Sequence, residues 1–131
     1  MNTPPPANGS AWRRLCRSFG WARRGVVVLL RTQANARIHA VAAGCAIVAG
    51  FVLGITRGEW CAVVAAIGLV FSVEGLNTAI EFVVDLASPE LHPLAEKAKD
   101  VAAGAVLLSA LTAAVIGLLV FGPHLLALVQ R

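Results

Sequence analysis

Charged residues are scarce in this sequence of 131 residues. They make up 14% of the chain, whereas an ordinary soluble domain contains roughly 25%. Hydrophobic residues make up 58%, and the mean hydropathy is +0.78. This balance excludes an ordinary soluble domain and indicates a protein whose helices lie in a membrane.

The motifs that mark the common nucleotide-binding folds are absent as well. The chain has no GxxxxGKS/T loop, no GxGxxG and no HRD or DFG motif, which excludes a P-loop and a protein-kinase site. The three cysteines are odd in number and lack metal-ligand spacing, so they indicate no cysteine-bound metal. No nucleic-acid-binding motif accompanies the net charge of +4, and we expect no nucleic-acid partner.

Long apolar runs are what the sequence does contain. A helix that spans a bilayer needs about 20 mostly apolar residues. Three segments provide them, at residues 38–56, 60–84 and 101–121. We therefore predict an all-α integral membrane fold with three transmembrane helices. The remaining residues are too few for a separate soluble core.

The N-terminal part has two different compositions. Residues 1–10 are rich in proline and asparagine and are predicted to be disordered. Residues 11–35 interleave arginines with Trp12, Phe19 and other apolar residues, which is typical of an amphipathic helix on a membrane surface. We therefore treat residues 11–131 as a single membrane domain.

Basic residues are concentrated before the first span. Seven of the eleven Lys and Arg residues precede residue 38, and no acid occurs before Glu59. By the positive-inside rule, we expect the N-terminus in the cytoplasm and a multi-pass protein of the cytoplasmic (inner) membrane. The loop at residues 57–59 is then outside, and residues 86–100 are inside.

Three acids interrupt the second apolar segment. On a helix that advances about 100° per residue, Asn77, Glu81 and Asp85 lie within roughly 60° of Glu74 and form one polar stripe. An ionised carboxylate that faces lipid costs about 2.5 to 3.5 kcal/mol at mid-span. The stripe should therefore face a bundle interior or a wet cleft, and we interpret it as a functional site. The alternative is a hydrogen-bonded seam between helices.

A second charged cluster follows at residues 86–100. Ser88-Pro89 and His92-Pro93 both look like helix starts, so a short turn should lead into a helix that continues through the third span. Charged residues of both signs stand at the start of this helix: Glu96, Lys97, Lys99 and Asp100. Carboxylates for a divalent cation and basic groups for phosphate oxygens would then gather at one depth, as phosphoryl transfer requires.

The segment EGLNTAIEFVVDLASPELHPLAEKAKDVAAGAVLL, Glu74 to Leu108, resembles the signature of the prokaryotic diacylglycerol kinase family, which includes the undecaprenol kinases. The motif E-x-x-N-T-A-I-E-x-x-x-D followed by A-K-D is long and fixed in spacing. The resemblance implies a homotrimer, in which each protomer has three spans and a surface helix. It also implies transfer of the ATP γ-phosphate to the hydroxyl of a membrane lipid, either diacylglycerol or undecaprenol. Residues 88–108 are more similar to the undecaprenol kinase branch.

The resemblance also implies roles for individual residues. Glu74 is expected to be the general base on the lipid hydroxyl, and Asn77 is expected to position that hydroxyl. Glu81 is expected to bind Mg²⁺, the implied cofactor, together with ATP. The residues implied for nucleotide binding are Arg14, Arg17, Glu81, Asp85, Lys99 and Asp100, of which the two arginines are the looser match.

Gln33 departs from the family pattern. Members commonly have a second metal-binding glutamate at this position, and a neutral amide binds Mg²⁺ more weakly than a carboxylate. Two hypotheses therefore remain. The chain is an active lipid kinase, or it is a catalytically weakened or inactive membrane scaffold that keeps the fold.

Small residues at four-residue spacing indicate close helix contacts. Ala46, Gly50 and Gly54 occur on the first span, and Ala113 and Gly117 on the third. Such faces let helices approach one another closely. Together with the polar stripe, which three spans cannot fully bury, they predict a homo-oligomer.

Overall fold

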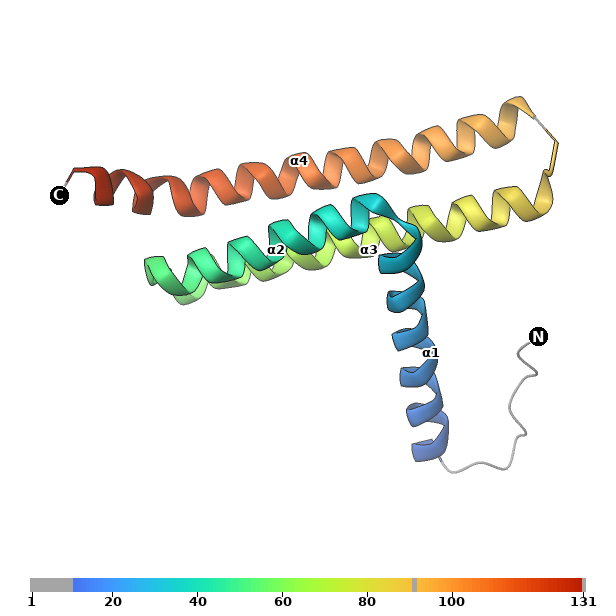
Figure 1. Ribbon diagram of the computed structural model, residues 1–131, viewed down its shortest axis with the longest axis horizontal. Coiled ribbons are helices and arrows are strands. Elements are labelled where there is room, and N and C mark those ends of the chain that lie inside the picture. The colour runs from blue at the N-terminus through green and yellow to red at the C-terminus, as the bar shows by residue number, and fades with distance from the viewer. Residues whose placement is uncertain (1–10, 91, 131) are drawn as a thin grey trace.

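A computed structural model of the protein describes residues 11–90 and 92–130. These residues form four helices and no strand: α1 (Ala11–Thr32), α2 (Ala34–Leu53), α3 (Arg57–Ala87) and α4 (Pro93–Val129). Figure 1 shows α2, α3 and α4 running along one another, with α1 leaving the group at one side. The all-α prediction is confirmed. The disorder predicted for residues 1–10 lies outside the described residues.

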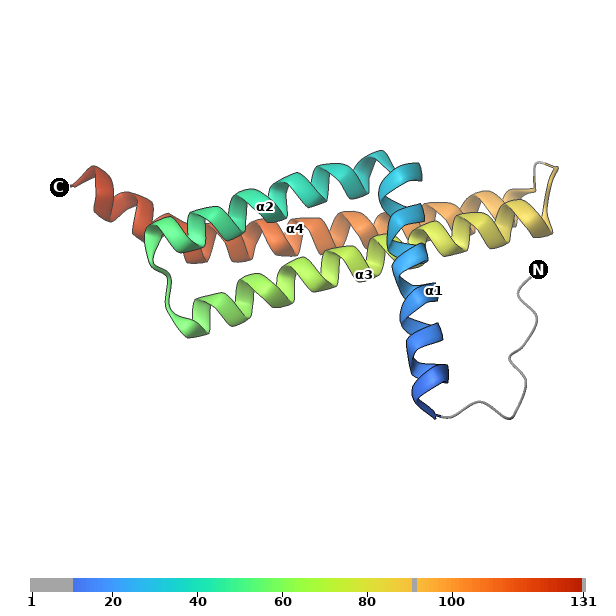
Figure 2. The ribbon, with the colours of Figure 1, turned by 60° about the horizontal axis from the view of Figure 1, so that its bottom comes forward.

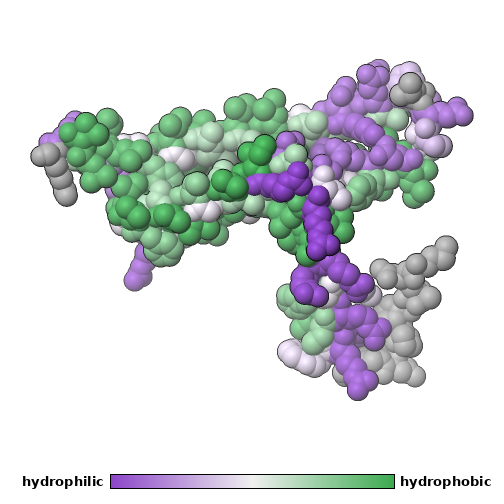
Figure 3. Space-filling model, in the orientation of Figure 1, coloured by the Kyte–Doolittle hydropathy of each residue, from purple (hydrophilic) through white to green (hydrophobic). Residues whose placement is uncertain are grey.

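The three long helices are the predicted spans. α2, α3 and α4 are each long and apolar enough to cross a membrane. Large apolar side chains on their outer surfaces are highly exposed, including Phe51 at 75%, Val52 at 77% and Leu118 at 73%. Figure 3 shows this apolar surface along the bundle, whereas hydrophilic residues gather over α1 and where α3 turns into α4. Such an apolar surface suits lipid rather than water.

The connection between α2 and α3 lies three residues earlier in the sequence than expected, at residues 54–56. α2 ends at Leu53, where Gly54 adopts a left-handed conformation with φ of 65°, which a glycine adopts without strain. Thr56 then starts α3. Its Oγ1 accepts a hydrogen bond from the Glu59 backbone at 3.4 Å, and Glu59 Oε2 accepts one from the Thr56 backbone at 2.7 Å. The prediction that residues 57–59 form the outer loop was wrong, because this capping box makes them the first turn of α3.

The turn between α3 and α4 contains one of the two predicted helix starts. His92 Nδ1 accepts a hydrogen bond from the Leu94 backbone at 3.2 Å, and Pro93 is the first residue of α4. Ser88 is instead the residue that ends α3, and its backbone N–H donates to the Val84 carbonyl at 2.8 Å. The Ser88-Pro89 prediction was therefore wrong. α4 continues to Val129, past the predicted end at residue 121.

Two of the small residues at the end of α2, Gly50 and Gly54, have structural roles within the protomer. A Cβ added at Gly50 would lie 2.8 Å from the Trp60 ring and 3.1 Å from Ile55 Cδ1. Gly50 therefore admits the aromatic ring that fixes α3 against the end of α2, and Gly54 provides the turn. Neither glycine supports the predicted homo-oligomer, because both are explained by contacts inside one protomer.

α1 runs crosswise to the bundle in both ribbon views (Figures 1 and 2). Gln33 alone separates it from α2, in an extended conformation. Arg37 Nη1 donates to the carbonyls of Leu30 and Arg31 at 3.5 and 3.2 Å, which pairs carbonyls that the end of α1 leaves free. Leu29 is buried where α1 meets α3. This is the arrangement expected of a surface helix followed directly by a span, although α1 ends at Thr32 rather than residue 35.

Candidate active site

One face of α3 carries both the core of the bundle and the polar stripe. The buried residues of this helix recur every three or four positions: Val63, Ala66, Val70, Glu74, Asn77 and Thr78. This spacing places them on one face of a helix. The N-terminal half of this face is apolar, and the half that begins at Glu74 is polar. Of the stripe that was predicted to face a bundle interior or a wet cleft, Glu74 and Asn77 are buried in the bundle and Glu81 is half-buried, whereas Asp85 is exposed and lines a cleft.

Glu74 is the most enclosed large side chain in the described part of the chain, at 1% exposure. Its Oε2 is buried and has no hydrogen-bond partner among those residues. The neighbouring Thr78 hydroxyl donates to the Glu74 main-chain carbonyl at 2.9 Å, so it does not satisfy the carboxylate. A buried oxygen without a donor is costly. Glu74 is thus arranged to accept a hydrogen bond from a group that residues 11–90 and 92–130 do not supply.

Glu81 is held by two amides from different parts of the fold. Asn77 Nδ2 donates to Glu81 Oε1 at 3.0 Å, and Gln33 Nε2 donates to Glu81 Oε2 at 3.0 Å. Gln33 stands at the elbow between α1 and α2, so this contact joins the surface helix to the polar stripe. Asn77 Oδ1 is buried and unpartnered within the described residues. It is the second free acceptor beside Glu74.

Asp85 and Lys99 connect the inner ends of α3 and α4. Lys99 Nζ lies 2.5 Å from Asp85 Oδ1, and the two side chains are 41% and 64% exposed. An ion pair this exposed contributes little to stability, so it can exchange partners at low cost. Both residues line a polar cleft of about 650 Å³ at the turn between the two helices.

Three residues expected at the nucleotide site are not brought to the acids in this protomer. Arg14, Arg17 and Asp100 are exposed, and no hydrogen bond or ion pair within residues 11–90 and 92–130 joins them to Glu81 or Asp85. The half of α1 that carries the two arginines points away from the bundle in both ribbon views (Figures 1 and 2). Their expected contacts with phosphate stay predictions.

The donor set fits a magnesium ion that arrives with a nucleotide. The described residues contain no group of three His, Cys, Asp or Glu side chains that could hold a metal alone. Mg²⁺ is, however, usually bound by one or two carboxylates together with substrate phosphates. Glu81 offers a carboxylate whose oxygens each accept one hydrogen bond and keep a free lone pair. Gln33 could add its amide oxygen after rotation of the amide group.

His39 was not selected from the sequence, yet it belongs to the surroundings of Glu74. It lies on α2, is half-buried, and lines the same pocket as Val70 and Phe71, which precede Glu74 on α3. The signal that could have identified it is an ionisable residue just inside a predicted span, which is the same rule that selected Glu74.

Comparisons with known proteins identify the family of this chain. A sequence model of the family described as Prokaryotic diacylglycerol kinase matches residues 20–121. The undecaprenol kinase of Bacillus subtilis (strain 168) is 46% identical over 112 residues, which cover 86% of this chain and 91% of that protein. The diacylglycerol kinase of Synechocystis sp. is 39% identical over 127 residues, covering 94% and 73%. The diacylglycerol kinase of Escherichia coli (strain K12) is 29% identical over 117 residues, covering 89% and 96%.

The matched region contains the elbow at Gln33, the whole polar stripe and the turn into α4, whereas Arg14 and Arg17 precede it. This chain is a membrane lipid kinase and belongs to the prokaryotic diacylglycerol kinase family.

Proposed function

We propose that the protein transfers the γ-phosphate of Mg-ATP to the hydroxyl of a polyprenol of the undecaprenol class. The observation that carries the proposal is the unpartnered Oε2 of Glu74, which is buried in the bundle next to a second free acceptor, Asn77 Oδ1. A lipid hydroxyl donates one hydrogen bond and would satisfy Glu74. The 46% identity to an undecaprenol kinase favours a polyprenol over diacylglycerol as the acceptor.

In the proposed reaction, Glu74 Oε2 accepts the proton of the lipid hydroxyl. The hydroxyl oxygen forms a bond to the γ-phosphorus while the bond from that phosphorus to the bridging oxygen of ATP breaks, which releases ADP and leaves the proton on Glu74. Asn77 lies between Glu74 and Glu81 on the same face. It is therefore placed to orient the hydroxyl, which supports catalysis by positioning.

Glu81 and Gln33 would hold the nucleotide at the inner end of the stripe. A magnesium ion bound with ATP supplies positive charge for the phosphate oxygens. Lys99 adds a cation if it exchanges Asp85 for a phosphate. Asp85 would then keep a supporting role in the site. Asp100 directly follows Lys99 on the exposed start of α4.

The nucleotide requires that the inner end of the stripe faces the cytoplasm. Seven of the eleven basic residues lie in α1 and at the start of α2, and the start of α4, directly after the turn from α3, carries two lysines. We therefore place the N-terminus and this turn on the cytoplasmic side of the inner membrane, with α1 on the membrane surface.

The direct test offers undecaprenol and diacylglycerol separately to the purified protein in micelles with Mg-ATP. Phosphorylation of undecaprenol at the higher kcat/KM is the expected result. A preference for diacylglycerol would overturn the proposal that a polyprenol is the acceptor. Phosphorylation of neither lipid would favour the scaffold hypothesis that Gln33 raises.

Gln33→Glu is expected to lower the Mg²⁺ concentration that gives half-maximal activity, by several fold. The substitution places two carboxylates at the spacing of the Gln33 to Glu81 hydrogen bond, 3.0 Å in this protein, and a divalent cation relieves their repulsion. Thermal unfolding should report the same change, since Mg²⁺ should raise the Tm of the variant more than that of the wild type. Gln33→Met is the matched control, because it keeps the length and adds no ligand. An unchanged metal dependence would place Gln33 outside the metal site.

We also propose a homotrimer. A single protomer leaves the arginines of α1 away from the acids, and its long helices expose many large apolar side chains. Neighbouring protomers can bring their arginines to these acids and can cover part of the apolar surface. Native mass spectrometry in mild detergent is expected to give a trimer mass, whereas a monomer with full activity would contradict the assembly.

A further inference from the structure

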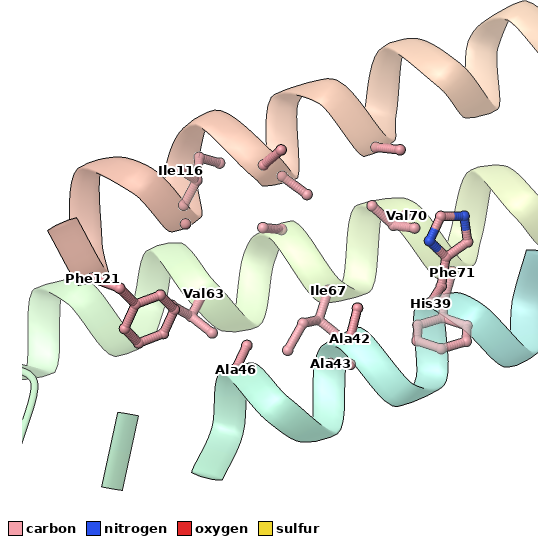
Figure 4. A pocket seen from close by; sticks show the side chains of 15 residues that line it. His39, Ala42, Ala43, Ala46, Val63, Ile67, Val70, Phe71, Ile116 and Phe121 are labelled. Carbon is pink, nitrogen blue, oxygen red and sulfur yellow. The ribbon is translucent and has the colours of Figure 1, made fainter. Parts of the chain in front are cut away.

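A cavity lies between α2, α3 and α4, with a volume of about 240 Å³. Its lining is almost entirely apolar and consists mainly of small residues, with seven alanines and one glycine among the side chains that form it. Figure 4 shows His39 and Phe71 at one end and Ile116 and Phe121 at the other. Small side chains on all three helices therefore leave space in the interior of the spans.

The cavity and the polar stripe occupy the same face of α3. Val63, Val70 and Phe71 line the cavity, and Glu74 is the next buried position of that face. From Val63 to Phe71 the cavity extends for about 12 Å along α3, at about 1.5 Å per residue. His39 of α2 borders the same end of the cavity as Phe71. A lipid whose hydroxyl lies at Glu74 would thus have an apolar space directly outward of its reacting end.

The volume suits a single branched chain. An apolar cavity of about 150 Å³ stays dry and holds one benzene, which has six carbon atoms. In proportion, the cavity here holds about ten carbon atoms, or two isoprene units. The alanine lining leaves room for the methyl branches of those units. Diacylglycerol carries two chains on adjacent carbon atoms, and only one of them could enter.

We infer that this cavity binds the first isoprene units of the polyprenol acceptor and so holds the lipid hydroxyl at Glu74. The inference rests on the proposed function and names the part of the lipid that the protein recognises. The tail comes from the bilayer rather than from water, so its burial adds no hydrophobic gain. Its benefit is orientation of the hydroxyl, which should be measured in kcat/KM.

Two variants reduce the cavity without touching Glu74 or the nucleotide residues. Ala113→Leu puts a larger side chain into it. Gly117→Ala is the milder change, because a Cβ at Gly117 meets no atom within 4 Å and alanine is the better helix former. Ala105→Leu is the matched control, since Ala105 is exposed on the same helix and does not line the cavity.

Ala113→Leu is expected to lower kcat/KM for undecaprenol by about tenfold, Gly117→Ala by less, and Ala105→Leu not at all. The KM for ATP and the mass of the oligomer should not change. Unchanged kcat/KM for undecaprenol in both cavity variants would overturn the inference while leaving the kinase function intact. A lower kcat/KM for diacylglycerol, with an unchanged kcat/KM for undecaprenol, would mean that the cavity binds an acyl chain. Dissociation of the Ala113→Leu oligomer would assign the cavity to a second copy of this chain.

A binding measurement separates this inference from the proposed function. Geraniol, an alcohol of two isoprene units, should raise the Tm of the wild type and of Ala105→Leu, but not that of Ala113→Leu. If neither lipid is phosphorylated, the proposed function fails, and this measurement alone decides whether the cavity binds isoprene units. Equal stabilisation of all three proteins by geraniol, or stabilisation of none, would overturn the inference.

Discussion

Glu74→Gln is expected to reduce kcat for lipid phosphorylation by about 100-fold or more, the loss typical of removing a general base. The substitution keeps the volume of the side chain and removes its proton-accepting charge. Glu74 is 1% exposed and its Oε2 has no donor in the described part of the chain. Removal of a buried, unpaired charge should also leave stability unchanged or raise it. The KM for ATP should change little, because Glu74 is not among the residues that we propose for nucleotide binding.

Glu59→Gln is the control for this prediction. It makes the same change on the same helix, at the opposite end, where Glu59 caps α3 and contacts His124 Nε2 at 3.1 Å. Glutamine can keep the capping hydrogen bond, but it removes the negative charge at the start of α3 and beside His124, so the variant should lose up to about 1 kcal/mol of stability and keep its turnover. Single-turnover kinetics and thermal unfolding of both variants provide the comparison. Near-normal turnover in Glu74→Gln together with a raised Tm would mean that the stripe is a helix seam.

Glu81→Gln is expected to raise the KM for Mg-ATP by about tenfold or more while the KM for the lipid stays the same, because the variant loses the only negative charge in the Gln33, Asn77 and Glu81 network. The fold should tolerate the change. Asn77 Oδ1 is unpartnered, so rotation of its amide would let it accept a hydrogen bond from the new side chain. Titration of activity with Mg-ATP at a saturating lipid concentration measures the effect.

Glu90→Gln separates metal binding from overall charge. Glu90 lies at the same end of the bundle, in the cleft near Lys99, but outside the amide network. The two variants have the same net charge. If they raise the KM for Mg-ATP equally, Glu81 acts through the general field and not as a ligand.

The type of each helix, spanning or surface, could be predicted from the sequence, but several helix ends could not. The apolar runs predicted three spans and the mixed segment predicted the surface helix, because both signals depend on composition over many residues. The predicted ends of α2 and α3 differ from the observed ends by a few residues. They depend on Gly54 and on the pairing of Thr56 with Glu59, which are single contacts that hydropathy does not report.

The candidate site was predicted in part. The spacing of Glu74, Asn77, Glu81 and Asp85 places them on one helix face because the backbone turns by a constant angle per residue. Their chemical roles came from a family resemblance. His39 and the cavity beyond it were not predicted, since both depend on how α2 and α4 pack against that face.

The sequence by itself determined three spans, a basic surface helix and a polar stripe on the second span. These are local properties, set by backbone periodicity and by the cost of polar groups in lipid. Only the tertiary structure decided that Gln33 meets Glu81, 48 residues away, and that the arginines of α1 lie apart from the acids of their own protomer. Both outcomes follow from the direction that the chain takes at one extended residue, and no pattern along the sequence specifies that direction.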